Sequence, residues 1–209
     1  MTKKLRLNVV IPVIILFINT SSFAQHVELT AFGGGTFAAG INNYSANYYK
    51  AQIGGSAHFG GTLDFFFTPN SSVNLTVFNQ PTTGYLFGSG SNKNRSAPMS
   101  MTYMLLGINR YVGNKKIKGY GGIGLGAVVM SASGYGSATK FAIDLHAGVK
   151  FEASDHVGLR LQVQLDAPVD GGGFGIGVGT GGAAVGVSTY SSILQLGGNI
   201  GIVFKFGGH

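Results

Sequence analysis

A glycine-rich stretch at residues 171–187, GGGFGIGVGTGGAAVGV, contains the spacing G-x-G-x-x-G at Gly177, Gly179 and Gly182. In a dinucleotide-binding site this spacing follows a buried strand and opens a helix, whose N-terminal amides hold the pyrophosphate. No helical periodicity follows Gly182, and a second match that begins at Gly119 lies inside a segment with strand periodicity. The glycines therefore predict no nucleotide site, and we expect no cofactor.

Histidine is the next residue type able to carry chemistry, and the chain has five: His26, His58, His146, His156 and His209. No two of them share a metal-ligand spacing such as H-x-x-x-H, so no metal site is predicted. His58 and His146 fall on the polar faces of two predicted strands, where they are able to approach each other. A structural hydrogen bond is the favoured interpretation there, ahead of metal binding or acid-base chemistry.

The first 24 residues have the pattern of a secretory signal peptide. Lys3, Lys4 and Arg6 precede a short apolar run, which ends in the cleavage-type sequence Ser22-Phe23-Ala24. The run is shorter than the roughly 20 apolar residues that a membrane-spanning helix needs. We therefore expect residues 1–24 to be removed and residues 25–209 to form one domain.

Composition restricts the class of the mature chain. The formal charge of +7 falls to +4 without Lys3, Lys4 and Arg6, so much of the apparent basicity belongs to the signal, and nucleic acid is not an expected partner. There is no cysteine, which excludes disulfides. With 36 glycines and only 10% charged residues, the chain resembles neither a disordered tail nor an ordinary soluble domain.

Period-two alternation of apolar and polar residues predicts strands. In residues 140–151 and 157–166 the apolar residues occupy the odd positions and the polar residues the even ones. The facing of residues 99–112 is ambiguous because the sequence MLLGI is apolar at consecutive positions. In all, eight strands are predicted at residues 27–37, 52–67, 72–79, 99–112, 117–130, 140–151, 157–166 and 192–206.

The connections between these strands alternate in length. TPNSS at 68–72, GNKK at 113–116 and EASD at 152–155 are short turns, whereas residues 38–51, 80–98, 131–139 and 167–191 are long, polar and rich in glycine. A soluble lipocalin-like barrel is the alternative, but it would bury its apolar face inside. Here the polar face is small and the apolar face has nothing in the sequence to cover it. An exported chain with such a face predicts contact with lipid.

The chain resembles the OmpA/OmpX-like superfamily of small outer-membrane β-barrels over nearly all of residues 27–206. The resemblance rests on the even strand count, the alternating connections, the hairpin GVKFEASDHVGLRLQVQ and the terminal strand GNIGIVFKF. It implies an eight-stranded antiparallel transmembrane barrel with both termini and the short turns in the periplasm. It also implies recognition of Phe204 and Phe206 by the barrel assembly machinery. No peptidoglycan-binding domain is expected, because the chain ends with the barrel.

The inward polar positions predict a filled lumen. Parity and the turn at 152–155 favour Asp144 opposite Gln164, His146 opposite Gln162 and Gly148 opposite Arg160, with the glycine making room for the guanidinium. Glu28, Asp64 and Lys205 are expected to adjoin where the barrel closes. The full predicted network is Glu28, His58, Asp64, Asp144, His146, Lys150, Arg160, Gln162, Gln164, Asp166 and Lys205.

Two surface interactions are also predicted. Lys50, Lys93, Arg95 and Lys140 lie in or beside the long loops, where a basic collar would contact the phosphates of lipopolysaccharide. Residues 171–187 predict a hairpin that extends the last two strands beyond the membrane, with Pro168 interrupting the ladder near its base. Such an exposed edge is able to pair with a strand of an extracellular partner.

The expected function is a monomeric, non-enzymatic outer-membrane barrel with an envelope structural or surface-interaction role. A narrow gated pore is the first alternative. A lipid A-modifying enzyme is the second, although the outward positions of the well-defined strands carry no Ser-His-acid set.

Overall fold

A computed structural model describes residues 26–45, 48–88, 94–134, 136–169, 174–179, 182–187 and 193–207. The predicted signal peptide, residues 1–24, lies outside this part of the chain. The described residues form the strands β1 (His26–Thr36), β2 (Ala39–Ser45), β3 (Tyr48–Ile53), β4 (Ser56–Thr68), β5 (Ser71–Gly88), β6 (Arg95–Gly113), β7 (Ile117–Ala132), β8 (Gly136–Glu152), β9 (Val157–Val169), β10 (Phe174–Gly179), β11 (Gly182–Val187) and β12 (Gln195–Phe206). None of them belongs to a helix long and apolar enough to span a membrane.

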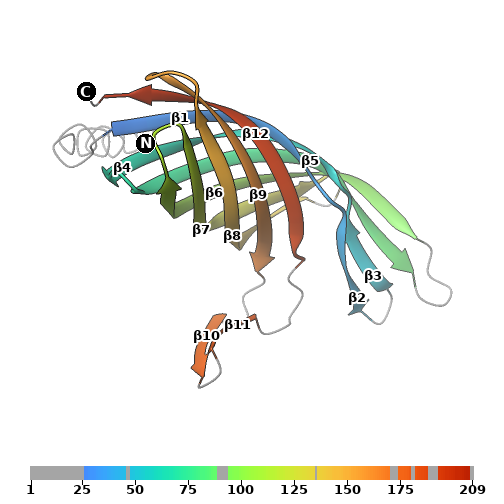
Figure 1. Ribbon diagram of the computed structural model, residues 1–209. Coiled ribbons are helices and arrows are strands. Elements are labelled where there is room, and N and C mark those ends of the chain that lie inside the picture. Colours follow the sequence, from blue (N-terminus) through green and yellow to red (C-terminus); the bar gives the residue numbers. More distant parts are fainter. Residues whose placement is uncertain are drawn as a thin grey trace, which may run out of the picture.

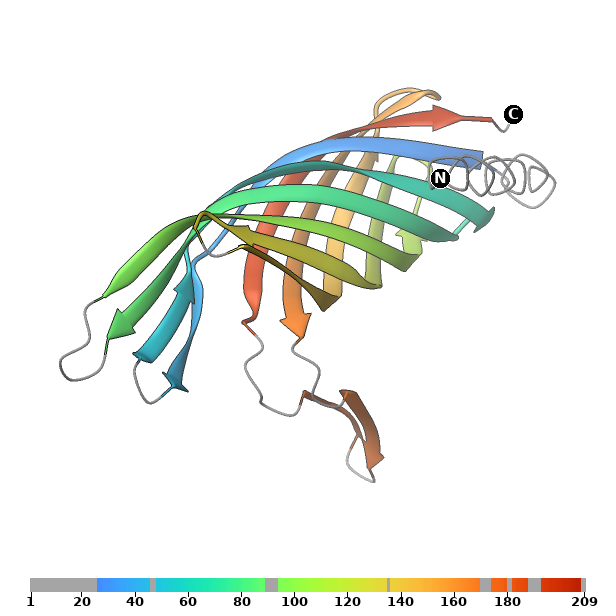
Figure 2. The same ribbon diagram turned by 180° about the vertical axis from the view of Figure 1, so that it is seen from behind.

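Eight of these strands close into one antiparallel ring in the order β1, β4, β5, β6, β7, β8, β9 and β12 (Figures 1 and 2). The ring closes where β1 pairs with β4 on one side and with β12 on the other. All backbone groups along these ladders therefore find partners inside the sheet, as a lipid environment requires. The predicted eight-stranded antiparallel barrel is confirmed.

The alternation of side chains turns an apolar face outward. Large hydrophobic residues with roughly half of their surface exposed follow one another around the ring, among them Leu75, Leu106, Ile108, Leu125, Leu145, Leu161, Val163, Ile200 and Ile202. On β6, whose facing the sequence left open, Tyr103 and Leu105 point inward and are buried, whereas Leu106 is 61% exposed. This outward belt is what a transmembrane barrel presents to lipid.

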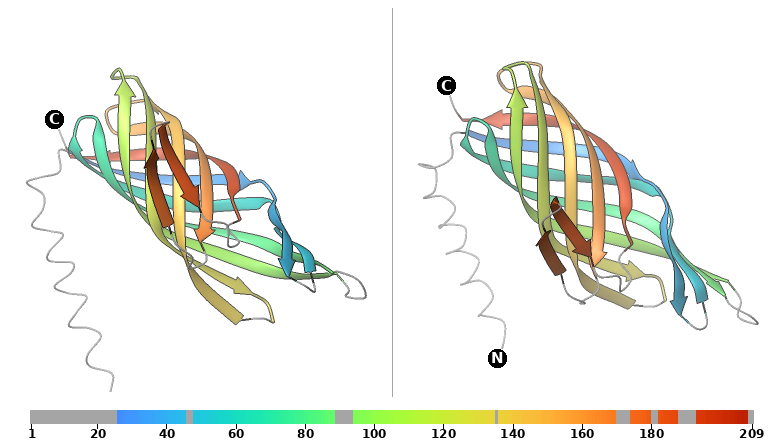
Figure 3. Two further views of the ribbon diagram at one scale, coloured as in Figure 1. Left: turned by 90° about the horizontal axis from the view of Figure 1, so that it is seen from below. Right: turned by 60° about the horizontal axis from the view of Figure 1, so that its bottom comes forward.

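At one end, several strands continue beyond the ring as a projecting sheet (Figure 3). It consists of β2, β3 and the ends of β5 and β6, residues 84–88 and 95–97, in the order β2-β3-β5-β6. The prediction of long loops at 38–51 and 80–98 is therefore wrong, because backbone pairing continues where the apolar alternation stops. Asn79 points outward and marks this end of the apolar belt on β5 and β6. Its amide donates to Ser100 Oγ (2.8 Å) and Thr102 Oγ1 (2.9 Å).

The β7–β8 connection is also shorter than predicted. The ladder between these strands runs to Ala132 opposite Gly136, so most of the predicted loop at 131–139 belongs to paired strands and the connections do not strictly alternate in length. Gly134 and Gly136 have φ angles of +80° and +84°, a conformation that other residues adopt at a cost. Glycine at these two positions permits the tight turn.

The glycine-rich stretch does form a hairpin. β10 pairs with β11 from Phe174 opposite Val187 to Gly179 opposite Gly182, and the predicted tip at residues 180–181 lies outside the described residues. It is a separate two-stranded sheet, however, and not a continuation of β9 and β12. Pro168 does not interrupt the ladder with β8, where it lies opposite Ala142. The β9–β12 ladder has ended at Asp166, so Pro168 occupies an edge, where a missing N–H is tolerated.

Candidate functional site: the barrel interior

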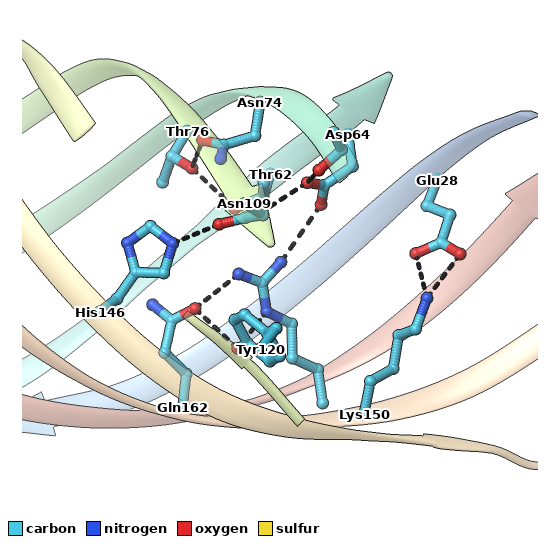
Figure 4. Close-up of polar contacts among 12 residues, drawn as sticks. Glu28, Thr62, Asp64, Asn74, Thr76, Asn109, Tyr120, His146, Lys150 and Gln162 are labelled. Carbon is cyan, nitrogen blue, oxygen red and sulfur yellow. Dashed lines mark hydrogen bonds and ion pairs between the residues drawn. The ribbon is translucent and has the colours of Figure 1, made fainter. Parts of the chain in front are cut away.

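The interior contains two layers of side chains. The layer nearer the short turns is polar and charged, and the layer nearer the projecting sheet is largely apolar. Both layers arise from the same alternation, because inward positions are even-numbered on β1, β4, β5, β7, β8 and β9 and odd-numbered on β6 and β12. The polar layer holds most of the residues predicted from the sequence (Figure 4).

A bidentate ion pair crosses the polar layer. Lys150 Nζ donates to both carboxylate oxygens of Glu28, at 2.7 and 2.8 Å. The ammonium also lies 5.2 Å from the ring centroid of Phe66 and 5.1 Å from that of Tyr111. Because both charges are buried, each depends on the other for compensation.

Arg160 forms the centre of the layer. Its Nε donates to Tyr120 Oη at 2.6 Å, one terminal nitrogen lies 3.2 Å from Asp64 Oδ2, and the other donates to Gln162 Oε1 at 2.6 Å. The guanidinium carbon lies 4.5 Å from the ring centroid of Tyr120. Asp64 also accepts from Ser72 Oγ at 2.8 Å. The guanidinium is therefore bonded on all of its nitrogens and oriented by three strands.

His146 links this centre to a second carboxylate. The amide of Asn109 donates to Asp64 Oδ1 at 2.9 Å, so its carbonyl oxygen is the acceptor for His146 Nε2–H at 2.6 Å. The other ring nitrogen, Nδ1, contacts Asp144 Oδ1. That contact needs one proton, held by either atom, so the pair of Asp144 and His146 is neutral overall. The charges of Asp64, Arg160, Asp144 and His146 are thus compensated locally, whereas the buried Asp166 lies opposite Asp144 and has, among the described residues, only the amide of Gln164 as a partner.

A chain of amides continues the network toward the apolar layer. Gln162 Nε2 donates to Gln164 Oε1 at 3.1 Å, and Gln164 Nε2 donates to Asp166 Oδ2 at 2.8 Å. Asn199 on β12 also donates to Gln164 Oε1, at 2.6 Å. The network therefore ties β9 to β12 from the inside as well as through the backbone.

The apolar layer closes the rest of the interior. Phe78 and Tyr103 stack with centroids 4.5 Å apart, and Met101, Leu105, Val128 and Ile53 pack around them. His58 lies here, 5.5 Å from Phe78 by ring centroid, and neither of its ring nitrogens has a hydrogen-bond partner. It makes no described contact with His146, so the predicted approach of the two histidines is not found.

The predicted register of the β8–β9 hairpin is wrong by two residues. Asp144 lies opposite Asp166, His146 opposite Gln164, Gly148 opposite Gln162 and Lys150 opposite Arg160. Gly148 does not make room for the guanidinium directly. A Cβ there would lie 2.5 Å from Tyr120 Oη, so the glycine accommodates the tyrosine that orients Arg160. A slip of two residues preserves every facing, which is why parity could not detect it.

The remaining predicted residues lie at the two ends of the barrel. Lys205 is adjacent to Glu28, as expected, but its Nζ pairs with Glu152 at 2.6 Å. On the projecting sheet, Lys50 Nζ lies 5.4 Å from the Phe87 ring centroid, and Arg95 is exposed. Lys140 is half-buried on β8, and Lys93 lies outside the described residues. Phe204 and Phe206 point outward on β12.

Sequence reasoning missed the inward aromatic residues and Asn109. Phe66, Tyr111 and Tyr120 form one buried cluster, and Phe78 and Tyr103 belong to another. Phe66 stands among three consecutive phenylalanines, so the sequence does not show which of them point inward. Asn109 and Tyr111 are two residues apart, and this spacing places both side chains on the same face of a strand. Among the described residues, no group of three His, Asp or Glu side chains is placed to hold a metal ion. The arrangement fills the lumen with side chains, and its ion pairs join Glu28 to Lys150 and Asp64 to Arg160.

The fold and this interior define a class of protein, an eight-stranded transmembrane β-barrel, and solved structures support that class. No protein-family model matches the chain, and no curated protein sequence matches it. Neisserial surface protein A (NspA) aligns with a TM-score of 0.56 at 11% identity, covering 86% of this chain and 97% of that one. OprG of Pseudomonas aeruginosa aligns at 0.52 and 12%, covering 88% and 97%.

A third solved structure is that of Ail, the attachment invasion locus protein of Yersinia pestis, in complex with the heparin analogue sucrose octasulfate. It aligns with a TM-score of 0.50 at 12% identity and covers 87% of this chain and 99% of that one. This chain therefore has the fold of a small outer-membrane β-barrel, as the resemblance to OmpA/OmpX-like proteins implied. The fold and the apolar belt together support an outer-membrane location.

Proposed function

We propose that this protein is a monomeric, non-enzymatic outer-membrane barrel that serves the envelope as a structural or surface-interaction protein. The observation that carries the proposal is the filled interior. The ion pair of Glu28 and Lys150 and the bonded guanidinium of Arg160 occupy one layer, and the stacked rings of Phe78 and Tyr103 occupy the next. Because two layers of side chains fill the lumen, a structural role is favoured over a pore.

The projecting sheet supports the surface role. β5 and β6 continue past the apolar belt and are joined by β2 and β3, which leaves β2 as an edge strand. Tyr49 and Tyr85 are exposed on this sheet, and the Phe87 ring lies 6.1 Å from Tyr49 by centroid. Aromatic rings beside a lysine suit contact with sugars and anionic groups. Strand pairing through residues 171–187 stays a second proposed means of contact.

The basic residues of the same end favour lipopolysaccharide as the first partner. Lys50, Lys93, Arg95 and Lys140 come from β3, the β5–β6 connection, β6 and β8. Anionic lipid phosphates attract such residues at roughly 1 kcal/mol each near the surface. The complex of Ail with a sulfated heparin analogue is a related case of anion binding by this fold.

Export and assembly complete the proposal. Residues 1–24 act as a cleaved signal peptide, and the outward Phe204 and Phe206 of the last strand serve the barrel assembly machinery. Intact mass and membrane fractionation test this: the mature protein begins at Gln25 and fractionates with the outer membrane. A mass that retains residues 1–24, or recovery as a soluble monomer without detergent, would contradict it.

Binding of lipopolysaccharide tests the surface role. Glutamine at Lys50, Lys93, Arg95 and Lys140 together should weaken binding of the purified barrel to lipopolysaccharide micelles. The control removes a similar charge from the other end, by glutamine at Lys115, Lys116 and Lys118 in and beside the β6–β7 turn. Equal binding by both variants would reject the basic collar, whereas loss in the collar variant alone supports it.

A further inference from the structure

A cavity of about 610 Å³ lies at the end of the barrel that carries the short turns. Its walls come from the start of β1, the β6–β7 turn, the β8–β9 turn and the end of β12. This volume lies within the range of small-ligand sites, which is roughly 300–1,000 Å³. The lining residues are His26, Glu28, Lys115, Lys116, Lys118, Glu152, Ala153, Ser154, Asp155, Lys205 and Gly207.

The carboxylates at the base of this cavity are already compensated. Glu28 accepts both hydrogen bonds of the buried Lys150 and lies 3.2 Å from His26 Nε2. Glu152 pairs with Lys205 at 2.6 Å and with Lys150 at 3.3 Å. These two acids therefore add little negative potential to the open space.

Three lysines of the lining remain without such compensation. Lys115, Lys116 and Lys118 form no ion pair with any carboxylate among the described residues. Lys118 is half-buried on the inward face of β7, directly opposite Lys150 in the β7–β8 ladder. Asp155 is the one other lining acid, and it is exposed in the β8–β9 turn. Within the described part of the chain, three unpaired lysines therefore line the cavity beside one unpaired acid, so the recess carries a net positive charge.

The recess has a rigid rim. Asn114 Oδ1 accepts the backbone N–H groups of Lys116 (2.9 Å) and Ile117 (2.8 Å), which holds the β6–β7 turn. The N–H of Glu152 donates to the carbonyl oxygen of Lys116 at 2.8 Å, which joins this turn to the end of β8. The backbone that carries the lysines is therefore ordered before any ligand arrives, which reduces the entropy lost on binding.

We infer that this recess binds a ligand that carries phosphate groups with two or more negative charges. Lysine ammonium groups act as point charges for phosphate oxygens, and here one lysine lies inside the mouth while two lie on its rim. A ligand with more than one anionic group satisfies both positions at once. In the proposed orientation the site faces the periplasm, at the opposite end from the lipopolysaccharide collar.

Calorimetric titration of the full mature barrel in dodecyl maltoside, with pyrophosphate as the probe, tests the inference. We expect saturable binding that the triple change K115Q/K116Q/K118Q weakens by about tenfold or more, since the charge-assisted contacts are lost. Lys118→Arg should retain binding, because it keeps the charge at the inner position. Heat-dependent gel mobility verifies that each variant is folded.

The matched control is K50Q/R95Q/K140Q, which removes three positive charges from the other end. It should bind pyrophosphate as the unaltered barrel does. Equal weakening of pyrophosphate binding in both triple variants would overturn the inference, and so would the absence of saturable binding by the unaltered barrel to both pyrophosphate and dihexanoyl phosphatidate. Because the collar variants lose lipopolysaccharide and the recess variants lose pyrophosphate, failure of one proposal is distinguishable from failure of the other.

A free phosphate compound and a phospholipid headgroup share this chemistry, so a second titration uses dihexanoyl phosphatidate. Binding of both probes with the same dependence on Lys118 assigns the site to phosphate groups in general. Binding of phosphatidate alone, again lost in the triple variant, supports a lipid headgroup as the ligand. If the triple variant still binds phosphatidate, the lipid binds to the apolar belt and not to the recess. That result would overturn the assignment to the recess.

Discussion

Lys150 Nζ on β8 and the carboxylate of Glu28 on β1 meet across the barrel interior, 122 residues apart in the chain. β1 and β8 are not neighbours in the ring, since β12 and β9 lie between them. The ion pair therefore connects opposite parts of the wall, and Figure 4 shows the two side chains reaching toward each other. Its position joins two non-adjacent strands through a buried contact.

Removing one partner of this pair should destabilise the barrel strongly. Lys150→Met removes the buried cation from Glu28 and leaves it only the contact with the partly exposed His26, at a cost of about 3–5 kcal/mol in the free energy of unfolding. The double change Glu28→Gln with Lys150→Met should recover most of it, because no isolated charge remains. Reversible urea unfolding in liposomes measures both.

The control for this prediction is Lys205→Gln at the mouth, where the pair with Glu152 is partly exposed and Lys150 also compensates Glu152. We expect a loss of about 1 kcal/mol or less there. A double variant at positions 28 and 150 that is as unstable as Lys150→Met would contradict the pairing.

Adjacent positions on β9 should respond in opposite ways to charge. Leu161 is 42% exposed on the outward face, so Leu161→Arg places a cation in lipid at about 2–4 kcal/mol. Gln162 points inward, and its Oε1 accepts from Arg160 and Tyr120, so Gln162→Glu keeps both acceptor contacts and loses only the donation to Gln164 Oε1. Urea unfolding should show a large loss in the free energy of unfolding for Leu161→Arg and not for Gln162→Glu. Similar losses would mean that the facing of β9 is wrong.

Gly148 should tolerate no side chain. A Cβ at this position would lie 2.5 Å from Tyr120 Oη and would also collide with the carbonyl oxygen of Leu161. Gly148→Ala is therefore expected to cost about 1–3 kcal/mol, as overpacking does. Gly121→Ala on β7 is the matched control, because the nearest atom to its Cβ would be His146 O at 3.8 Å. Equal stability of the two variants would contradict the packing of Tyr120.

The purified barrel should show no sustained large conductance in planar bilayers. The polar layer around Arg160 and the apolar layer of Phe78 and Tyr103 both obstruct the lumen. Replacing Phe78 and Tyr103 by alanine should not open a stable channel, because the polar layer remains. A stable open channel in the unaltered protein would instead favour a pore.

Excision of residues 172–187 should leave the barrel intact. β10 and β11 pair only with each other in the described structure, so the ring of eight strands does not depend on them. We expect the shortened protein to insert into lipid and to keep its compact, heat-sensitive gel mobility. Loss of surface binding would support the strand-pairing proposal, and failure to fold would show that this segment supports the barrel wall.

Apolar–polar alternation was enough to predict eight ring strands and, for most of them, which residues face outward. Alternation with period two is a local property, so it predicts that Leu161 points outward and Arg160 inward without knowledge of any neighbour. It failed on β6, where Leu105 and Leu106 are both apolar and only burial inside the ring separates them. It also overlooked the projecting sheet, because backbone pairing there continues without alternation.

Which inward residues are partners follows only from the folded barrel. A slip of two residues between β8 and β9 leaves every side chain on its own face, so Asp144 opposite Gln164 and Asp144 opposite Asp166 are equally compatible with the local pattern. Closure of the ring brings β1 to face β8 across the lumen, and the contact of Glu28 with Lys150 is decided there. Such contacts between distant segments depend on the curvature of the whole barrel, which no short stretch of sequence encodes.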